Sequence, residues 1–159
     1  DEDKALEYNQ QYMDKNPNAA PTDFMKLAEI YINKAKKDPA KKVENIDKAI
    51  GVYAKLAEKY PTLKPFAKLQ EGNTAFQNEL DDKAIAAYTE VINELEAKQC
   101  DEDELSYLKT SYQYMGFIYT YDKQDFNTAK PYWDKLLKLD PQNKLANDAY
   151  EKAGLKPGE

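Results

Sequence analysis

The residues that usually carry out catalysis are scarce in this sequence. It contains no histidine, the commonest general base and the commonest metal ligand among side chains. Cys100 is the only cysteine, so neither an intrachain disulfide nor a Cys-x-x-Cys pair can form. Without histidine, no serine or cysteine triad of the usual kind can be assembled. We therefore expect no catalytic residue, no metal site and no cofactor.

The acidic run CDEDEL, residues 100–105, has the charge but not the pattern of a calcium site. Calcium loops place oxygen ligands at alternating positions and a glycine at the sharp turn, and this run has no glycine. Acidic residues in the first turn of a helix interact favourably with the positive end of its dipole. We interpret the run as a helix start at Asp101 to Asp103, with Cys100 as an inert thiol near a helix end.

The basic run could be a phosphate or anionic-lipid site only if its lysines converged. They lie on both sides of a predicted turn, with no aromatic residue among them, at Lys34, Lys36, Lys37, Lys41 and Lys42. We predict a solvated turn instead. The formal net charge of −6 also argues against nucleic acid as a partner, and no glycine-rich phosphate loop is present.

Composition favours helix throughout the chain. Of 159 residues, 33% are charged and only 5 are glycine, so we predict an all-α fold. No apolar run approaches the roughly 20 residues needed to span a bilayer, which predicts a soluble domain without membrane insertion. The sequence begins with Asp1 and not with methionine, so it could be a mature product or a fragment of a longer protein. A mature product after leader removal would suit a bacterial periplasm or cell envelope, whereas a fragment would leave a cytoplasmic location open.

A pattern of small and aromatic residues recurs along the chain. One copy has Tyr112, Met115, Gly116 and Tyr119, followed by Ala129, Trp133, Leu136 and Pro141. An earlier copy has Phe24, Leu27, Ala28 and Tyr31, followed by Ala49, Tyr53, Leu56 and Pro61. A middle copy has Gly72, then Ala84, Tyr88 and Val91, while Ala5, Tyr12 and Pro17 fit a second helix without its partner.

This pattern resembles the tetratricopeptide repeat (TPR), a helix-turn-helix unit of about 34 residues with a closing proline. The resemblance implies a single all-α domain over 1–159, a right-handed superhelical α-solenoid of about eight helices in antiparallel pairs. It comprises the second helix of a partial repeat over 1–17, a repeat with an extended turn over 22–61, repeats over 64–99 and 104–141, and a capping helix over 143–153.

The resemblance also assigns structural positions. Ala28, Gly72 and Gly116 on the first helices should face Ala49, Ala84 and Ala129 on the second helices, where the two helices cross. Tyr53, Tyr88 and Trp133 should fill the wider space above these crossings, and Pro61 and Pro141 should close two of the repeats. Because glycine inside a helix costs about 1 kcal/mol relative to alanine, Gly116 predicts a close approach of two backbones.

Two departures from the family pattern lead to separate expectations. Extra residues in the first copy predict that its second helix begins at Asp38 and Pro39 and extends to Tyr60. In the middle copy, alignment on Gly72 puts Lys68 and Glu71 at apolar positions. A shift of one residue would instead bury the apolar set Phe66, Leu69 and Phe76, and both rotations remain open.

The resemblance implies recognition of a protein or peptide on the concave face, which is made mainly by the first helices. The residues expected there are Met25, Glu29, Ile32, Asn33, Asn73, Gln77, Gln113, Tyr114, Phe117 and Tyr121. Family members that hold the acidic tail of chaperones use Lys and Asn at positions occupied here by Met25, Glu29, Gln70, Thr110 and Tyr114. We therefore expect no carboxylate clamp for chaperone tails.

The leading functional hypothesis is a non-catalytic scaffold or adaptor that binds a protein partner. The alternative is a small-ligand or glycan-binding accessory domain of a bacterial cell-envelope system, and an enzyme is least favoured. A terminal helix or a neighbouring chain could instead cover the aromatic patch, which leaves homo-oligomer formation open. A sugar platform would use exposed aromatics, whereas Trp133 is assigned to the core, so the exposure of Trp133 discriminates between the first two hypotheses.

Overall fold

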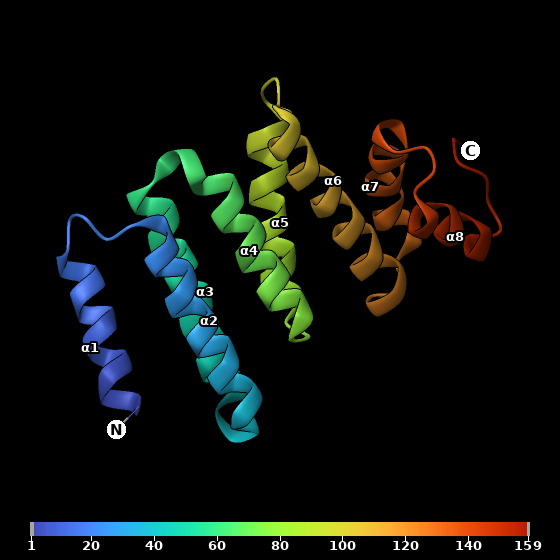
Figure 1. Ribbon diagram of the computed structural model, residues 1–159. Coiled ribbons are helices and arrows are strands. Elements are labelled where there is room, and N and C mark those ends of the chain that lie inside the picture. Colours follow the sequence, from blue (N-terminus) through green and yellow to red (C-terminus); the bar gives the residue numbers. More distant parts are fainter. Residues whose placement is uncertain (1, 159) are drawn as a thin grey trace. The chain divides into compact units, whose positions relative to one another are not determined.

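The computed structural model describes residues 2–158, without the side chains of residues 2, 3 and 5. The position predicted for Ala5 in a partial repeat therefore lies outside the described side chains. The described residues form eight α-helices and no β-strand, which confirms the all-α class (Figure 1). The helices are α1 Glu2–Lys15, α2 Pro21–Lys37, α3 Lys42–Lys59, α4 Lys64–Gln77, α5 Asp81–Glu96, α6 Glu102–Phe117, α7 Phe126–Leu139 and α8 Lys144–Ala153.

The turn between α2 and α3 accounts for the extra residues of the first copy. The Asp38 carboxylate accepts a hydrogen bond from the Ala40 N–H at 3.1 Å, and Pro39 opens a short 3-10 helix, η1 (Pro39–Lys41). The α-helix itself begins at Lys42, and Tyr60 ends it. The predicted start at Asp38 and Pro39 thus marks the 3-10 turn that precedes the helix.

The acidic run begins α6, as predicted. The Asp101 carboxylate accepts a hydrogen bond from the Glu104 N–H at 2.9 Å, and the Glu104 carboxylate accepts one from the Asp101 N–H at 3.2 Å. This reciprocal pair is a capping box, which satisfies two N–H groups that the helix leaves unbonded. The carboxylates of Asp101 and Glu104 are therefore used in local structure.

The last helix lies within the range expected for a cap. Asn143 precedes it and accepts a hydrogen bond from the Ala146 N–H at 3.1 Å. Gly154 follows it with φ 71°, a left-handed conformation that glycine adopts at little cost. The Gly154 and Leu155 N–H groups then donate to the carbonyls of Glu151 and Tyr150, which closes the helix end.

The chain packs as two compact units, Asp1–Ala84 and Ile85–Glu159. In the first unit, α2 packs along α3 and α3 along α4. In the second, α6 packs on α7, and α8 contacts both of these helices. The deepest side chains of the second unit include Met115, Ile118, Trp133, Leu136 and Tyr150. The right-handed superhelix stays a prediction.

Helix α4 combines parts of the two rotations left open by the sequence. Gly72 and Glu71, which the first rotation turns inward, are buried, and so is Leu69, which the second rotation turns inward. Phe66 and Phe76 are half-buried. The buried Glu71 carboxylate lies 3.2 Å from the Lys68 ammonium, which offsets part of the cost of burying a charge.

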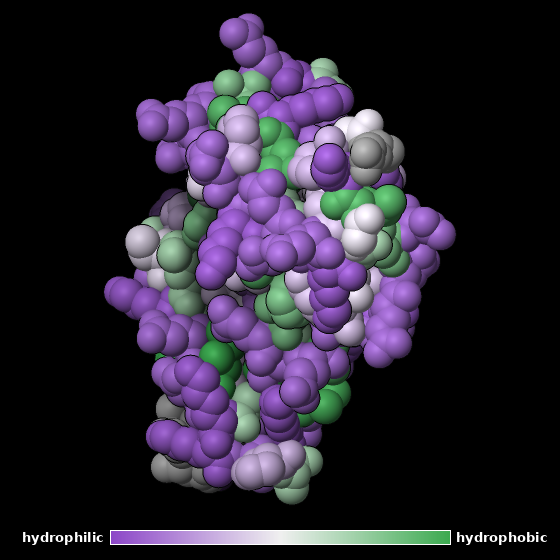
Figure 2. All heavy atoms as spheres, turned by 90° about the vertical axis from the view of Figure 1, so that its right-hand side faces the viewer, coloured by the Kyte–Doolittle hydropathy of each residue, from purple (hydrophilic) through white to green (hydrophobic). Residues whose placement is uncertain are grey.

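The surface is mostly polar where Figure 2 shows it, with hydrophobic side chains in small separate groups. Among the described residues, no helix is both long enough and apolar enough to cross a bilayer.

Candidate functional site

Most of the predicted structural positions are buried. They are Ala28, Ala49, Tyr53, Gly72, Ala84, Tyr88, Gly116, Ala129 and Trp133. Pro61 and Pro141 are exposed and occupy turns that follow α3 and α7. Proline lacks a backbone N–H, so these two residues end helices without filling the core.

The atoms nearest to an added Cβ at Gly116 belong to a side chain, and the facing of Gly116 and Ala129 stays a prediction. A Cβ atom added to Gly116 would lie 2.5 to 2.8 Å from three ring atoms of Trp133. The indole therefore lies over Gly116, and its Nε1 donates a hydrogen bond to Thr120 Oγ1 at 2.9 Å. The sequence identified the need for a small residue but not the group that requires it.

The residues expected to face a partner all remain at least partly accessible. Met25, Glu29, Asn33 and Gln77 are exposed, while Ile32, Asn73, Gln113, Tyr114, Phe117 and Tyr121 are half-buried. The first unit carries the positions on α2 and α4, and the second unit carries those on α6 and the segment that follows it. Their accessibility is compatible with a binding surface on either unit.

Part of the second set meets α8. Gln113 and Phe117 lie on α6, and Tyr121 lies in a π-helical segment, η3 (Ile118–Asp122), that continues from it. The rings of Phe117 and Tyr121 are 4.8 Å apart, centroid to centroid. Asn143 Nδ2 donates to Gln113 Oε1 at 3.2 Å, and Lys152 Nζ lies 4.6 Å from the centroid of the Tyr121 ring.

We call these five residues the α6–α8 face: Gln113, Phe117, Tyr121, Asn143 and Lys152. This face combines two adjacent aromatic rings, two hydrogen-bonded amides and the Lys152 ammonium group over the Tyr121 ring. The distance from the ammonium to the ring is typical of cation–π contacts. Burial raises the pKa of Tyr121, and the nearby Asp148 carboxylate adds to this effect. Tyr121 is therefore a neutral hydroxyl at neutral pH, able to donate or accept a hydrogen bond.

Tyr114 belongs to a different surface. Its ring stacks on that of the buried Tyr88 from α5, at 5.6 Å between centroids and 14° between planes. Gln113 and Tyr114 are adjacent in sequence, and successive residues of a helix point in different directions. The set predicted on α6 is thus divided between an α5 side and an α8 side.

The sequence did not identify the α8 residues of this face. The segment was expected to be a cap, and helix caps are assigned by position and not by the contacts of single side chains. Asn143 was recognisable as a helix-capping residue type, but its bond to Gln113 depends on how α8 packs. Lys152 carried no signal that distinguished it from the other lysines on the surface.

The groups considered for chemistry have structural surroundings. Cys100 is half-buried between α5 and α6, and its Sγ donates to the Leu95 carbonyl at 3.3 Å. Burial raises the pKa of this thiol, which keeps it protonated and weakly nucleophilic. Among the described residues, no group of three or more His, Cys, Asp or Glu side chains is arranged to hold a metal ion.

Comparison with known families bears on the first unit. A family model described as the tetratricopeptide repeat matches residues 24–62, a stretch that begins within the first turn of α2 and ends just after α3. Residues 24–62 are thus similar to a tetratricopeptide repeat. The remaining helices are consistent with a chain of the TPR type. Searches of curated proteins and of solved structures gave no match to this chain.

The buried residues of this stretch pack together. Ala28, Ala49 and Tyr53 belong to one buried cluster, to which α1 and α4 also contribute side chains. At the end of the repeat, the ring of Tyr60 meets that of Phe24 edge to face, with centroids 6.4 Å apart. The Tyr60 hydroxyl also donates to the Ala19 carbonyl at 2.7 Å, which ties the end of α3 to the residues before α2. TPR units indicate protein–protein interaction as the broad class of function.

Proposed function

We propose that this chain is a non-catalytic interaction module that holds a segment of a partner protein on the α6–α8 face. The observation that carries the proposal is the accessible pair of rings, Phe117 and Tyr121, next to the linked amides of Gln113 and Asn143. Aromatic side chains contribute disproportionately to binding energy at protein interfaces. Side-chain amides can both donate to and accept from the backbone of a bound segment.

The glycan-binding alternative receives less support. Sugar platforms use exposed aromatic faces, and tryptophan offers the largest one, but Trp133 is completely buried. Its Nε1 is also engaged by Thr120. We therefore expect a soluble quencher to reduce Trp133 fluorescence only weakly in the folded chain. Strong quenching of Trp133 fluorescence would favour the glycan-binding hypothesis.

Selection of peptides from a displayed random library against the whole chain tests the proposal. For the selected peptides, we expect Phe117→Ala and Tyr121→Ala to weaken binding by about tenfold or more, as anchor residues do. The control is Tyr8→Ala, because Tyr8 is an exposed tyrosine on α1, outside the face. Melting temperatures of all three variants should stay close to that of the parent chain.

The proposal is wrong if the selected peptides bind outside the α6–α8 face. Unchanged affinity for both face variants would place the binding surface on other residues. A strong loss of stability in Phe117→Ala would instead show that Phe117 acts in the core.

A further inference from the structure

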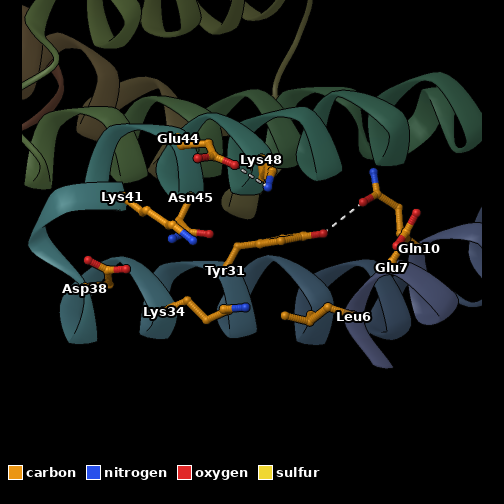
Figure 3. A pocket seen from close by; sticks show the side chains of 10 residues that line it. All are labelled: Leu6, Glu7, Gln10, Tyr31, Lys34, Asp38, Lys41, Glu44, Asn45 and Lys48. Atoms are coloured by element: carbon orange, nitrogen blue, oxygen red, sulfur yellow. Dashed lines mark hydrogen bonds and ion pairs between the residues drawn. The ribbon is translucent and has the colours of Figure 1, made fainter. Parts of the chain in front are cut away.

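The first unit contains a pocket that shares no residue with the α6–α8 face. A ligand of this pocket would be a function separate from the one proposed above. Side chains from α1, α2, η1 and α3 enclose a pocket of about 440 Å³ (Figure 3). This volume lies within the range of small-molecule sites in proteins. Tyr31 forms one wall, and its hydroxyl donates to Gln10 Oε1 at 2.8 Å, which joins α2 to α1.

Asn45 is the most informative residue of the pocket. It is only 5% exposed, yet among the described residues no group forms a hydrogen bond with its side-chain amide. Figure 3 shows the amide directed from α3 into the space between α2 and α3. Its nitrogen and oxygen are not among the fully enclosed polar atoms of the described residues that lack a partner, so they remain accessible from the pocket. A ligand in the pocket can therefore both donate to and accept from the Asn45 amide, which has two N–H donors and one carbonyl acceptor.

Charged groups of both signs surround the amide. The Lys41 backbone N–H donates to the Asp38 carbonyl at 3.1 Å. The Lys41 ammonium and the Asp38 carboxylate are therefore side-chain groups of the same turn. Among the described residues, the Lys41 side chain takes part in no ion pair. Lys48, by contrast, lies 2.6 Å from Glu44.

The charges of the lining balance. The lysines are Lys34, Lys41 and Lys48, and the carboxylates are Glu7, Asp38 and Glu44. A phosphate would be attracted by the lysines but repelled by an equal number of carboxylates. A molecule with one positive and one negative group matches both sets.

We infer that this pocket binds a zwitterionic small molecule of the α-amino acid or dipeptide type. Its carboxylate accepts hydrogen bonds from the Lys41 ammonium and the Asn45 amide. Its ammonium group faces the Asp38 carboxylate, and its side chain packs on the Tyr31 ring. Charge-assisted hydrogen bonds of this kind are stronger than neutral ones, which gives both charges of the ligand a role.

Titration of the ¹⁵N-labelled chain with three related peptides tests the inference. Glycyl-leucine is the zwitterion, N-acetyl-glycyl-leucine keeps only the carboxylate, and glycyl-leucinamide keeps only the ammonium. We expect glycyl-leucine to shift amide signals within residues 31–48, with a dissociation constant of about 1 mM or lower. The other two peptides should each bind about tenfold more weakly, which corresponds to about 1.4 kcal/mol.

Two variants and a control identify the residues. Asn45→Leu keeps the approximate size of the side chain and should weaken glycyl-leucine binding about tenfold with little change in melting temperature, because among the described residues it breaks no hydrogen bond of the amide. Lys41→Ala changes an exposed residue and should weaken binding to a similar extent, even if Asn45→Leu perturbs folding. Lys37→Ala is the control, since Lys37 is an exposed lysine at the end of α2, close in sequence to Lys41, and does not line the pocket.

Three results would overturn the inference. The first is the absence of signal changes in residues 31–48 at millimolar glycyl-leucine, which would leave water as the partner of Asn45. The second is equal binding of the acetylated peptide, which would indicate a site for simple anions. The third is unchanged binding to both Asn45→Leu and Lys41→Ala. None of these results depends on Phe117 or Tyr121, so they leave the proposed function unaffected.

Discussion

Two glycines in helix interiors, one in each unit, have opposite surroundings. Gly51 in α3 is exposed, and an added Cβ atom would meet no atom within 4 Å. Gly116 in α6 is buried, and an added Cβ atom would lie 2.5 Å from the Trp133 ring. Both glycines cost helix stability, but only Gly116 provides space for a large neighbour in return. A glycine inside a helix is therefore evidence of close packing only where its neighbours are also buried.

The Trp133 ring accounts for the absence of a side chain at position 116. In the first unit, Tyr53 shares a buried cluster with Ala28. In the second unit, Trp133 is completely buried against Gly116, and it also bonds to Thr120. The middle copy combines Gly72 with Tyr88, so ring size alone does not determine the small residue; at Gly116, however, the Trp133 ring fills the space that a side chain would need. A substitution at Gly116 therefore has to be considered together with the residue at position 133.

Removal of residues 143–159, which include α8, should have the largest effect in the second unit. The truncation removes the buried side chains of Ala146, Ala149 and Tyr150. Tyr150 also packs edge to face on Phe126 and donates to the Asp134 carboxylate. We expect a loss of at least about 3 kcal/mol of unfolding free energy, comparable to truncation of one large buried side chain. Urea unfolding measures it, and an unchanged midpoint would contradict the role of α8 as a cap.

Gly116→Leu should have the next largest effect. A leucine side chain would overlap the indole of Trp133, which is completely buried and cannot move aside freely. We expect a loss of about 3 kcal/mol, the upper end of typical overpacking costs. Chemical denaturation measures the loss.

The matched control for this substitution is the double variant Gly116→Leu and Trp133→Leu. Because the smaller residue at 133 relieves the overlap, the double variant should be more stable than the sum of the two single effects implies. Additive effects, or a Gly116→Leu variant as stable as the parent chain, would mean that the α6 helix is rotated differently.

Much of the fold could be predicted because small and aromatic residues recur at fixed spacing. The Gly116 and Trp133 positions, the Asp101 helix start and the last helix all follow from local residue types. The α6–α8 face could be predicted only in part, since the bond between Gln113 and Asn143 depends on how two helices pack. Asn45 carried no sequence signal, because an asparagine in a helix is usually solvated and its burial results from tertiary structure.

Glu96→Gln should have a smaller effect that depends on pH. Burial acts to raise the pKa of Glu96, but hydrogen bonds from Lys135 at 2.7 Å and Tyr112 at 2.5 Å outweigh it, so the pKa is lowered. A lowered pKa means that the carboxylate stabilises the fold above its ordinary pKa of 4.5. This contribution is lost as the pH falls below 4.5 and through the lowered value.

The difference in stability between the parent chain and Glu96→Gln measures this contribution. Because Glu96 is exposed, we expect less than about 1 kcal/mol at pH 7. The difference should shrink steadily as the pH is lowered from 4.5. A difference that stays constant down to acidic pH would show that Glu96 acts through packing and not through its charge.

Gly51→Ala should have the smallest effect and the opposite sign. Alanine lowers the conformational entropy of the unfolded chain and suits a helix better, and the space around Gly51 is open. We therefore expect a gain of about 0.5 to 1 kcal/mol in unfolding free energy, measured by urea unfolding beside Gly116→Ala. At position 116 the same substitution should reduce stability, because the added methyl group meets the Trp133 ring. If both substitutions stabilised the chain, helix propensity alone would govern the two sites and Gly116 would have no role in accommodating the indole.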